Sequence, residues 1–294
     1  YYKQAGIPVL GIEPAANVAK VAQEQRGIPT LCEFFGEKLA RRLRKQEKRA
    51  DVIHAHNVLA HVPDLNGFVR GIKLLLKDDG VAVIEVPYVK DMIDRCEFDT
   101  IYHEHVFYYS LIALINLFKA ADLEIYDVEM TPMQGGSLLV FISHPNNFPV
   151  SENVKNLSAQ EFYSRFDTIE SYRKVNENVG RIKEEIIKLL KKIKSEGKKI
   201  AAYSAPAKGN ILLNYFGIND NYLDFIVDKA KEKQGLYTPG THLLVYSPEK
   251  IYEEKPDYLL ILCWNLIDEI KEQLKDYHEK GGKFIVPLPS VKII

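Results

Sequence analysis

The densest group of chemically capable side chains is the run Tyr102-His103-Glu104-His105. Two imidazoles, a carboxylate and a phenol within four residues can supply a general base and a partner that orients it. A histidine with its ordinary pKa of about 6.5 can accept a proton near neutral pH. In an extended segment alternate residues share a face, which would place Tyr102 and Glu104 on one side and both histidines on the other. A hydrogen-bonded loop anchor is the alternative role.

Three further histidines stand close together, at His54, His56 and His61. A tetrahedral metal site needs three or four converging ligands. No cysteine or carboxylate stands nearby at a matching spacing, so we expect no metal in this chain. The segment is better interpreted as a loop that borders a ligand pocket.

Two strand ends carry residues suited to a nucleotide. Glu13 follows an apolar run, and an acidic residue at that edge of an α/β sheet commonly binds ribose hydroxyls. A solvated carboxylate is the alternative. The run Ser204-Ala-Pro-Ala-Lys208-Gly209-Asn210 has small residues and a cation where a helix is expected to begin, which favours a bound diphosphate. It is neither a complete Walker A loop nor a complete G-x-G-x-x-G fingerprint.

The elements that must position these residues alternate between strands and helices. Apolar strands separated by amphipathic helices predict a doubly wound parallel sheet. A turn is expected at Asp79-Gly80, and 123–129 and 137–143 are expected to pair in antiparallel fashion. The predicted strands of the first half are 9–12, 28–32, 50–54 and 81–86, and its predicted helices are 15–26, 36–48 and 65–76.

A polar, proline-bearing break at 144–149 predicts a domain boundary, with domains at 1–148 and 149–294. One long or broken helix is expected at 159–195. A second βα series then predicts a smaller doubly wound sheet. Its predicted strands are 199–203, 223–227, 258–263 and 284–287, with a loop at 204–210 and helices at 211–216 and 266–277.

Composition excludes several classes of protein. The 294 residues carry a formal net charge of -1, which argues against a nucleic-acid coat or a membrane-surface protein. No apolar stretch approaches the roughly 18 residues of a membrane span. Three widely spaced cysteines suit reduced thiols, so we expect a cytoplasmic protein. The opening at Tyr1 reads as the tail of a helix, and we expect the domain's first elements to be missing.

Ordered motifs run along nearly the whole chain, at 57–64, 79–80, 84–87, 98–105, 134–137, 204–210, 227–228, 233–235, 238–241, 264–265 and 269–270. Together they resemble the sugar C-methyltransferases, which are S-adenosylmethionine-dependent enzymes acting on nucleotide-linked keto-deoxysugars. The resemblance implies a partial class I methyltransferase-like sheet, lacking its first strand and glycine-rich loop, followed by a second Rossmann-like α/β domain. A zinc-binding segment of the family would also precede Tyr1, so zinc is expected only there.

The resemblance implies methyl transfer to a carbon next to the ketone of a sugar nucleotide, dTDP-linked by expectation, through an enolate. It makes His105 the base, with Glu104 and Tyr102 orienting it or stabilising the enolate, and His61 near cofactor and substrate. A non-catalytic sugar-nucleotide-binding module and an NAD-dependent oxidoreductase are the alternatives. The expected cofactor-binding residues are Glu13, Pro14, Phe34, Asn57 and Val58, and the expected substrate-binding residues are Ser204, Lys208, Gly209, Asn210, Lys233 and Asn265.

Overall fold

The computed structural model describes residues 1–131, 135–166 and 168–294. They form two compact units. Unit 1 comprises 1–86, 106–131 and 137–161, and unit 2 comprises 87–105, 135–136 and the described residues of 162–294. This division differs from the predicted boundary after residue 148. Segment 87–105 belongs to unit 2 because Phe98 packs in that unit's apolar core and Asp99 binds Trp264.

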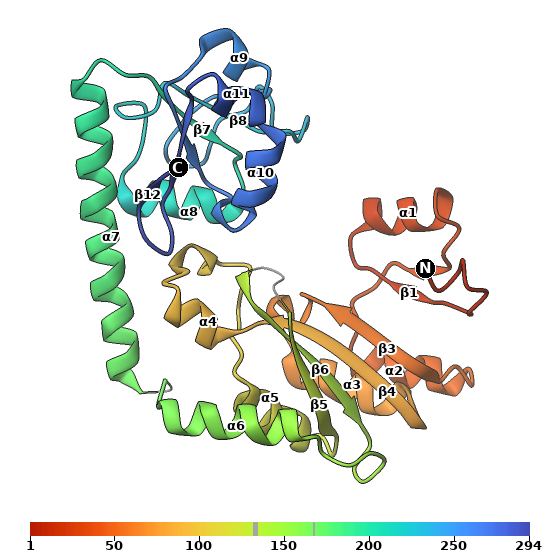
Figure 1. Cartoon of the computed structure of the whole chain (residues 1–294). Coiled ribbons are helices and arrows are strands. Elements are labelled where there is room, and N and C mark those ends of the chain that lie inside the picture. The colour runs from red at the N-terminus through yellow and green to blue at the C-terminus, as the bar shows by residue number, and fades with distance from the viewer. Residues whose placement is uncertain (132–134, 167) are drawn as a thin grey trace. The chain divides into compact units, whose positions relative to one another are not determined.

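Unit 1 contains two sheets among its described residues (Figure 1). Strands β1 and β2 form a parallel pair, and the second sheet has the order β3-β4-β6-β5. β3 and β4 are parallel and β5 and β6 antiparallel, as predicted. The elements are β1 (Gly11–Ile12), α1 (Ala16–Glu24), β2 (Thr30–Leu31), α2 (Glu37–Lys45), β3 (Ala50–His56), η1 (Leu59–His61), α3 (Leu65–Leu75), β4 (Leu76–Pro87), α5 (Leu111–Lys119), β5 (Glu124–Thr131), β6 (Ser137–Ser143) and α6 (Glu152–Ser164).

Two local predictions for unit 1 need correction. The predicted single sheet is divided, since β1-β2 and β3-β4-β6-β5 are separate sheets. The predicted turn at Asp79-Gly80 lies inside β4. There the register shifts, because Ala50 pairs with Leu76 but Val52 pairs with Val81. The extra residues of β4 are accommodated as a strand irregularity instead of a connection between elements.

Unit 2 contains a six-stranded sheet with the order β12-β11-β10-β7-β8-β9. Its neighbours are parallel except for β12, which is antiparallel to β11. Numbered from β7 and read from β9, the order is 3-2-1-4-5-6, as in a Rossmann fold but with the sixth strand antiparallel, which confirms the second doubly wound sheet. The elements are α4 (Val89–Asp94), η2 (Phe98–Thr100), α7 (Ile169–Ser195), β7 (Ile200–Tyr203), α8 (Ala207–Phe216), β8 (Phe225–Val227), β9 (Val245–Tyr246), α9 (Lys250–Glu254), β10 (Tyr258–Ile261), η4 (Trp264–Leu266), α10 (Ile267–Gln273), α11 (Lys275–Glu279), β11 (Lys283–Val286) and β12 (Lys292–Ile293).

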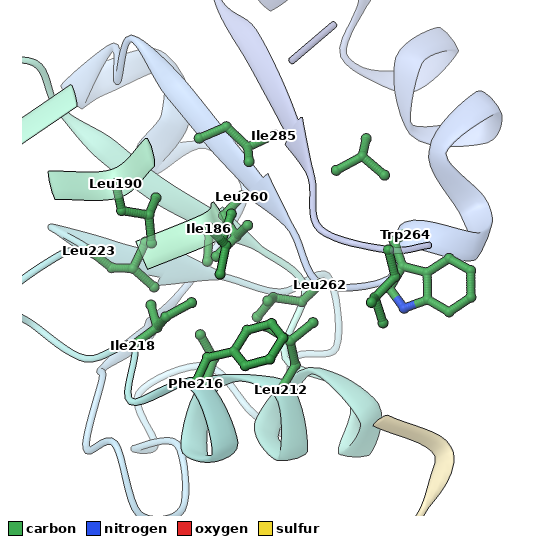
Figure 2. Close-up of a cluster of buried hydrophobic side chains, with 14 of the residues drawn as sticks. Ile186, Leu190, Leu212, Phe216, Ile218, Leu223, Leu260, Leu262, Trp264 and Ile285 are labelled. Carbon is green, nitrogen blue, oxygen red and sulfur yellow. The ribbon is translucent and has the colours of Figure 1, made fainter. Parts of the chain in front are cut away.

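The core of unit 2 lies between its sheet and helices α7 and α8 (Figure 2). Ile182, Ile186 and Leu190 recur every four residues along α7 and are buried, as an amphipathic helix requires. They pack with Phe216 of α8 and with strand residues such as Leu260. Each fully buried side chain of this kind contributes roughly 1.5–3 kcal/mol. The other face of the sheet packs against Ile270 of α10, Tyr277 of α11, and Leu274 between these two helices.

The helical predictions for the second half hold with shifted ends. The helix expected at 159–195 is two described helices, α6 and α7. The expected loop at 204–210 is shorter, because α8 begins at Ala207, directly after Pro206. Proline has a fixed φ and no N–H to satisfy, so it suits a helix start. The helix expected at 266–277 is divided into η4, α10 and α11.

Candidate active site

Asn57 follows β3 and presents a buried acceptor. Its backbone is left-handed, with φ of 54°, and its N–H donates to the Glu85 carbonyl at 2.9 Å. Its side-chain Oδ1 is buried and has no hydrogen-bond partner in the part of the chain that the structure describes. Leaving such an atom unsatisfied costs about 1–3 kcal/mol, so a donor from a ligand or water fits there. The neighbouring Val58 is 41% exposed.

A buried carboxylate that the sequence analysis did not select organises the adjacent strand. Glu85 Oε2 lies 2.8 Å from His56 Nδ1, and its Oε1 accepts a bond from Thr131 Oγ1 at 3.1 Å. His54 Nδ1 lies 3.4 Å from His56 Nε2. Burial, assisted by the charge of His56, lowers the pKa of His54. The signal in the sequence is one carboxylate within the otherwise apolar run 81–86.

The remaining expected residues of unit 1 lie at loops and helix ends. His61 is the exposed last residue of η1, while the carbonyl of its neighbour Ala60 accepts the Val106 N–H at 2.9 Å. Glu13 follows β1 directly, and its Oε1 accepts the Ala15 N–H at 2.8 Å. That bond uses one of two carboxylate oxygens. Phe34 is 75% exposed and Pro14 is also exposed.

In unit 2, Tyr102 and His105 form a hydrogen-bonded pair. The segment is a turn in which the His105 N–H donates to the Tyr102 carbonyl at 2.9 Å. The turn brings Tyr102 Oη to 3.0 Å from His105 Nε2, with 4.2 Å between the ring centroids. The predicted alternation of faces is therefore wrong, because a turn places its first and last residues on the same side.

The hydrogen bonds determine which nitrogen of His105 is basic. Nδ1 lies 2.9 Å from the carbonyl oxygen of Thr100, which can only accept, so Nδ1 carries the proton. Nε2 then holds the lone pair and accepts the bond from the Tyr102 hydroxyl. This tautomer is the one in which a histidine acts as a base through Nε2.

His103 and Glu104 stand apart from this pair of rings. Their side chains are 91% and 62% exposed, and His103 Nε2 lies 3.9 Å from Glu104 Oε1. The structure thus brings Tyr102 and His105 together by a direct bond and places His103 toward solvent. Of the two histidines, His105 is half-buried and has an assigned tautomer.

Two buried acids precede this turn. Asp99 is fully buried and its Oδ2 accepts the Trp264 indole N–H at 2.7 Å. Burial raises the pKa of Asp99 to about 6, although the Trp264 bond and the Lys208 charge oppose the rise. Burial likewise raises the pKa of Glu97 to about 7 against the opposing charge of Lys208. Gly135 has φ of 94°, and a Cβ there would lie 2.6 Å from Glu97 Oε2, which explains the glycine.

Asp228, at the end of β8, organises the loop after β7. Its Oδ2 accepts bonds from the Ala205 N–H at 2.7 Å, Lys233 Nζ at 3.0 Å and Ser204 Oγ at 3.3 Å. Its Oδ1 accepts the Ala230 N–H at 2.8 Å. Burial opposes ionisation, but these donors outweigh it and lower the pKa of Asp228. Ser204 and Lys233 are therefore brought together by one carboxylate.

The first turn of α8 carries three of the other expected substrate residues. Lys208 Nζ lies 5.8 Å from the centroid of the Trp264 ring, near the two buried acids. Gly209 allows close packing, because a Cβ there would lie 2.7 Å from Leu262 Cβ. Asn210 donates to the Pro206 carbonyl at 3.0 Å, and its buried Oδ1 has no hydrogen-bond partner among the described residues. Asn265 is exposed on η4.

Two features are absent from the described residues. Outside the omitted positions 132–134 and 167, no group of three or more His, Cys, Asp or Glu residues is arranged to hold a metal ion. Within the same described ranges, no helix has both the length and the apolar character needed to cross a membrane.

Comparisons with known proteins agree with this architecture. Residues 132–289 match the C-methyltransferase C-terminal domain, and residues 1–128 match a methyltransferase domain. The C-methyltransferase NovU of Streptomyces niveus is 34% identical over 294 residues, which is 100% of this chain and 70% of the relative.

Among solved structures, magnesium protoporphyrin IX methyltransferase (ChlM) of Synechocystis PCC 6803 with bound SAM has a TM-score of 0.35 at 12% identity, over 48% of this chain and 61% of that one. The complex of the Haloferax volcanii Trm112 methyltransferase activator and a putative methyltransferase has a TM-score of 0.39 at 13% identity, over 49% of this chain and 76% of that one. NovU, which matches all 294 residues of this chain, and the two domain matches show that the chain belongs to the C-methyltransferase family.

Proposed function

We propose that this C-methyltransferase moves a methyl group from S-adenosylmethionine to the carbon next to the ketone of a nucleotide-linked keto-deoxysugar, with dTDP as the nucleotide. The observation that carries the proposal is the Tyr102–His105 pair, whose tautomer is set by the Thr100 carbonyl. A ketone acidifies the neighbouring C–H bond, and a neutral imidazole is a suitable base for it near pH 7.

His105 Nε2 receives the carbon-bound proton in this mechanism. The Nδ1–H bond to Thr100 stays in place and supports the imidazolium that forms. Once Nε2 is protonated, the Tyr102 hydroxyl loses its acceptor and can donate to the enolate oxygen. Donors placed where negative charge develops lower the barrier to reaction. We keep Glu104 and His61 in the proposed catalytic set as supporting residues.

The residues of unit 1 fit the methyl donor. When bound, S-adenosylmethionine supplies an electrophilic methyl group on a sulfonium. The buried Oδ1 of Asn57 has no hydrogen-bond partner among the described residues. It would suit a donor such as the ammonium group of S-adenosylmethionine. The exposed ring of Phe34 suits adenine, and Glu13 stands at the strand-end position suited to ribose. Pro14 and Val58 adjoin these residues and complete the proposed cofactor set.

The sheet order also supports a cofactor edge in unit 1. β1 and β3 are each paired in parallel on one side only among the described strands. Ligands of parallel sheets bind at the carboxyl ends of the strands. Glu13 and Asn57 follow the carboxyl ends of β1 and β3, which belong to separate sheets of unit 1.

We place the sugar nucleotide on unit 2. β7 lies between β10 and β8, which is the point where strand order reverses and where ligands of open α/β sheets bind. The proposed substrate residues surround that point, and the start of α8 there favours an anion. They are Ser204, Lys208, Gly209, Asn210, Lys233 and Asn265.

The NAD-dependent alternative has no support from unit 2. In a dinucleotide fold the acid that ends the second strand binds ribose. Asp228 occupies that position, but both of its oxygens accept bonds from the protein's own groups. A non-catalytic binding module would not need a base with a defined tautomer, so the His105 arrangement favours an enzyme.

A variant pair tests the proposed base. His105→Ala is expected to lower kcat by roughly 10²–10⁴-fold, the usual contribution of a general base, with cofactor binding nearly intact. It should also abolish exchange of the substrate's α-hydrogen with deuterated water. His103→Ala is the matched control in the same turn and should retain activity, since that ring is in solvent. Near-normal turnover of His105→Ala would show that the base is another group.

Ligand binding tests the proposed substrates independently. Thermal shifts with S-adenosylhomocysteine and dTDP, but not with NAD, are the expected responses of the full-length protein. Lys208→Ala should raise the substrate KM more than it lowers kcat, because a diphosphate contact acts on ground and transition states alike. An unchanged KM would remove Lys208 from the substrate site and leave it as the charge partner of Glu97 and Asp99.

A further inference from the structure

We propose that Asp99 and Trp264 are positioning residues that hold the Tyr102–His105 pair in its basic tautomer. The inference rests on the proposed function of His105 and adds two residues that act on the pair of rings through the η2 turn and the Thr100 carbonyl. It concerns only unit 2, to which all four residues belong.

The chain of contacts begins at the imidazole. His105 Nδ1 is bonded to the Thr100 carbonyl, so the orientation of that carbonyl decides which nitrogen is protonated. Thr100 is buried and closes the η2 turn, with its N–H and Oγ1 donating to the Glu97 carbonyl at 3.1 and 2.8 Å. The position of η2 therefore sets the position of the Thr100 carbonyl, which determines the tautomer of His105.

η2 is held on unit 2 by the two residues that precede Thr100. Asp99 Oδ2 accepts the Trp264 indole N–H at 2.7 Å, and the two residues are 0% and 6% exposed. Phe98 packs on Tyr215 and Phe216 of α8, with ring centroids 5.2 and 5.1 Å apart. Apolar packing of Phe98 constrains how deeply η2 lies in the core of unit 2. The hydrogen bond from the indole N–H is directional and therefore constrains rotation of η2. Loss of that bond should let the Thr100 carbonyl turn away from His105.

Trp264→Phe is the informative change, because it keeps an aromatic ring in the core and removes the donor to Asp99 together with part of the buried indole. Mispositioning of a catalytic group by about 1 Å can cost 10²-fold. We expect kcat to fall roughly 10- to 100-fold, with KM for substrate and cofactor within about twofold of wild type. Asp99→Asn retains an acceptor oxygen for the indole N–H and should therefore keep much of the wild-type kcat. Asp99→Ala has no such acceptor and should show the full loss of kcat.

The tautomer itself supplies a readout that does not depend on turnover. Nitrogen-15 NMR of histidine-labelled protein should show a protonated Nδ1 and an unprotonated Nε2 for His105 in wild type, and a mixture of tautomers in Trp264→Phe. Since Trp264 is the single tryptophan of the chain, its emission should also shift toward longer wavelength in Asp99→Ala. Tyr277→Phe, another buried aromatic change in unit 2, is the control and should alter neither signal nor kcat.

The outcomes separate the two proposals. A mixed tautomer with reduced kcat supports the positioning role. Unchanged His105 nitrogen shifts in Trp264→Phe overturn it, whatever the activity. A mixed tautomer with wild-type kcat also overturns it, because the tautomer then does not limit the reaction. If His105→Ala itself keeps normal turnover, the proposed role of His105 as the base fails, while the NMR result still decides whether Asp99 and Trp264 set the tautomer.

Discussion

Replacing Glu97 with glutamine measures the free energy that the fold loses when a buried carboxyl group ionises. Glu97 is 3% exposed, and burial raises its pKa from the ordinary 4.5 to about 7, with the charge of Lys208 opposing the rise. The folded protein therefore prefers the protonated side chain, whereas the unfolded chain ionises it near its ordinary pKa. Glutamine resembles the protonated form and does not ionise.

The sign of the pH dependence follows from this difference. The contribution of Glu97 is fully present below pH 4.5 and is lost as pH rises to about 7, because only the unfolded chain releases its proton readily in that range. Each pKa unit corresponds to about 1.4 kcal/mol, so the loss is at most about 3 kcal/mol. Asp99, with a pKa near 6, adds a loss of the same sign.

Urea unfolding at pH 5 and pH 8 is the assay. We expect wild type to be less stable at pH 8, and Glu97→Gln to recover most of its share of that difference, leaving the part due to Asp99. Glu253→Gln, an exposed carboxylate in the same unit, is the control and should follow wild type. Equal stability of wild type at both pH values, or an equal decline in Glu97→Gln, would refute the reasoning.

Three further changes test packing and charge. Gly209→Ala should destabilise unit 2 by about 1–3 kcal/mol in urea unfolding, because its Cβ would lie 2.7 Å from Leu262 Cβ. Gly71→Ala should destabilise unit 1, although alanine favours a helix by about 1 kcal/mol, since its Cβ would lie 2.8 Å from the backbone carbon of Gly36; a stabilised variant would contradict this contact. Lys233→Met should lower stability at pH 7 but not near pH 3, because the depressed pKa of Asp228 contributes stability only while the acid is ionised; equal losses at both pH values would argue against the ion pair.

Periodicity and turn residues alone predicted most of the elements. Apolar runs such as 81–86 are long enough to be strands, and β-strand and helix periods differ strongly, so their alternation predicted two doubly wound units. The strands expected at 123–129 and 137–143 were predicted to pair in antiparallel fashion, as β5 and β6 do. The family was also evident from ordered motifs, since those residues are local in sequence.

Tertiary structure decided what local patterns do not encode. The strand order in unit 1, the inclusion of 87–105 in unit 2 and the position of Asp99 against Trp264 depend on contacts between residues distant in the chain. Glu85 and Glu97 were not among the predicted site residues, because a carboxylate has no distinctive period and its importance comes from burial.

The pairing of Tyr102 with His105 shows what only the tertiary structure decided about the candidate base. The four residue types identified a candidate base from the sequence, but an extended segment and a turn present them differently. Which histidine is held, and which of its nitrogens is basic, was decided by a backbone turn and by the Thr100 carbonyl. Residue types determine the chemistry that is possible, and the folded backbone determines which atoms meet.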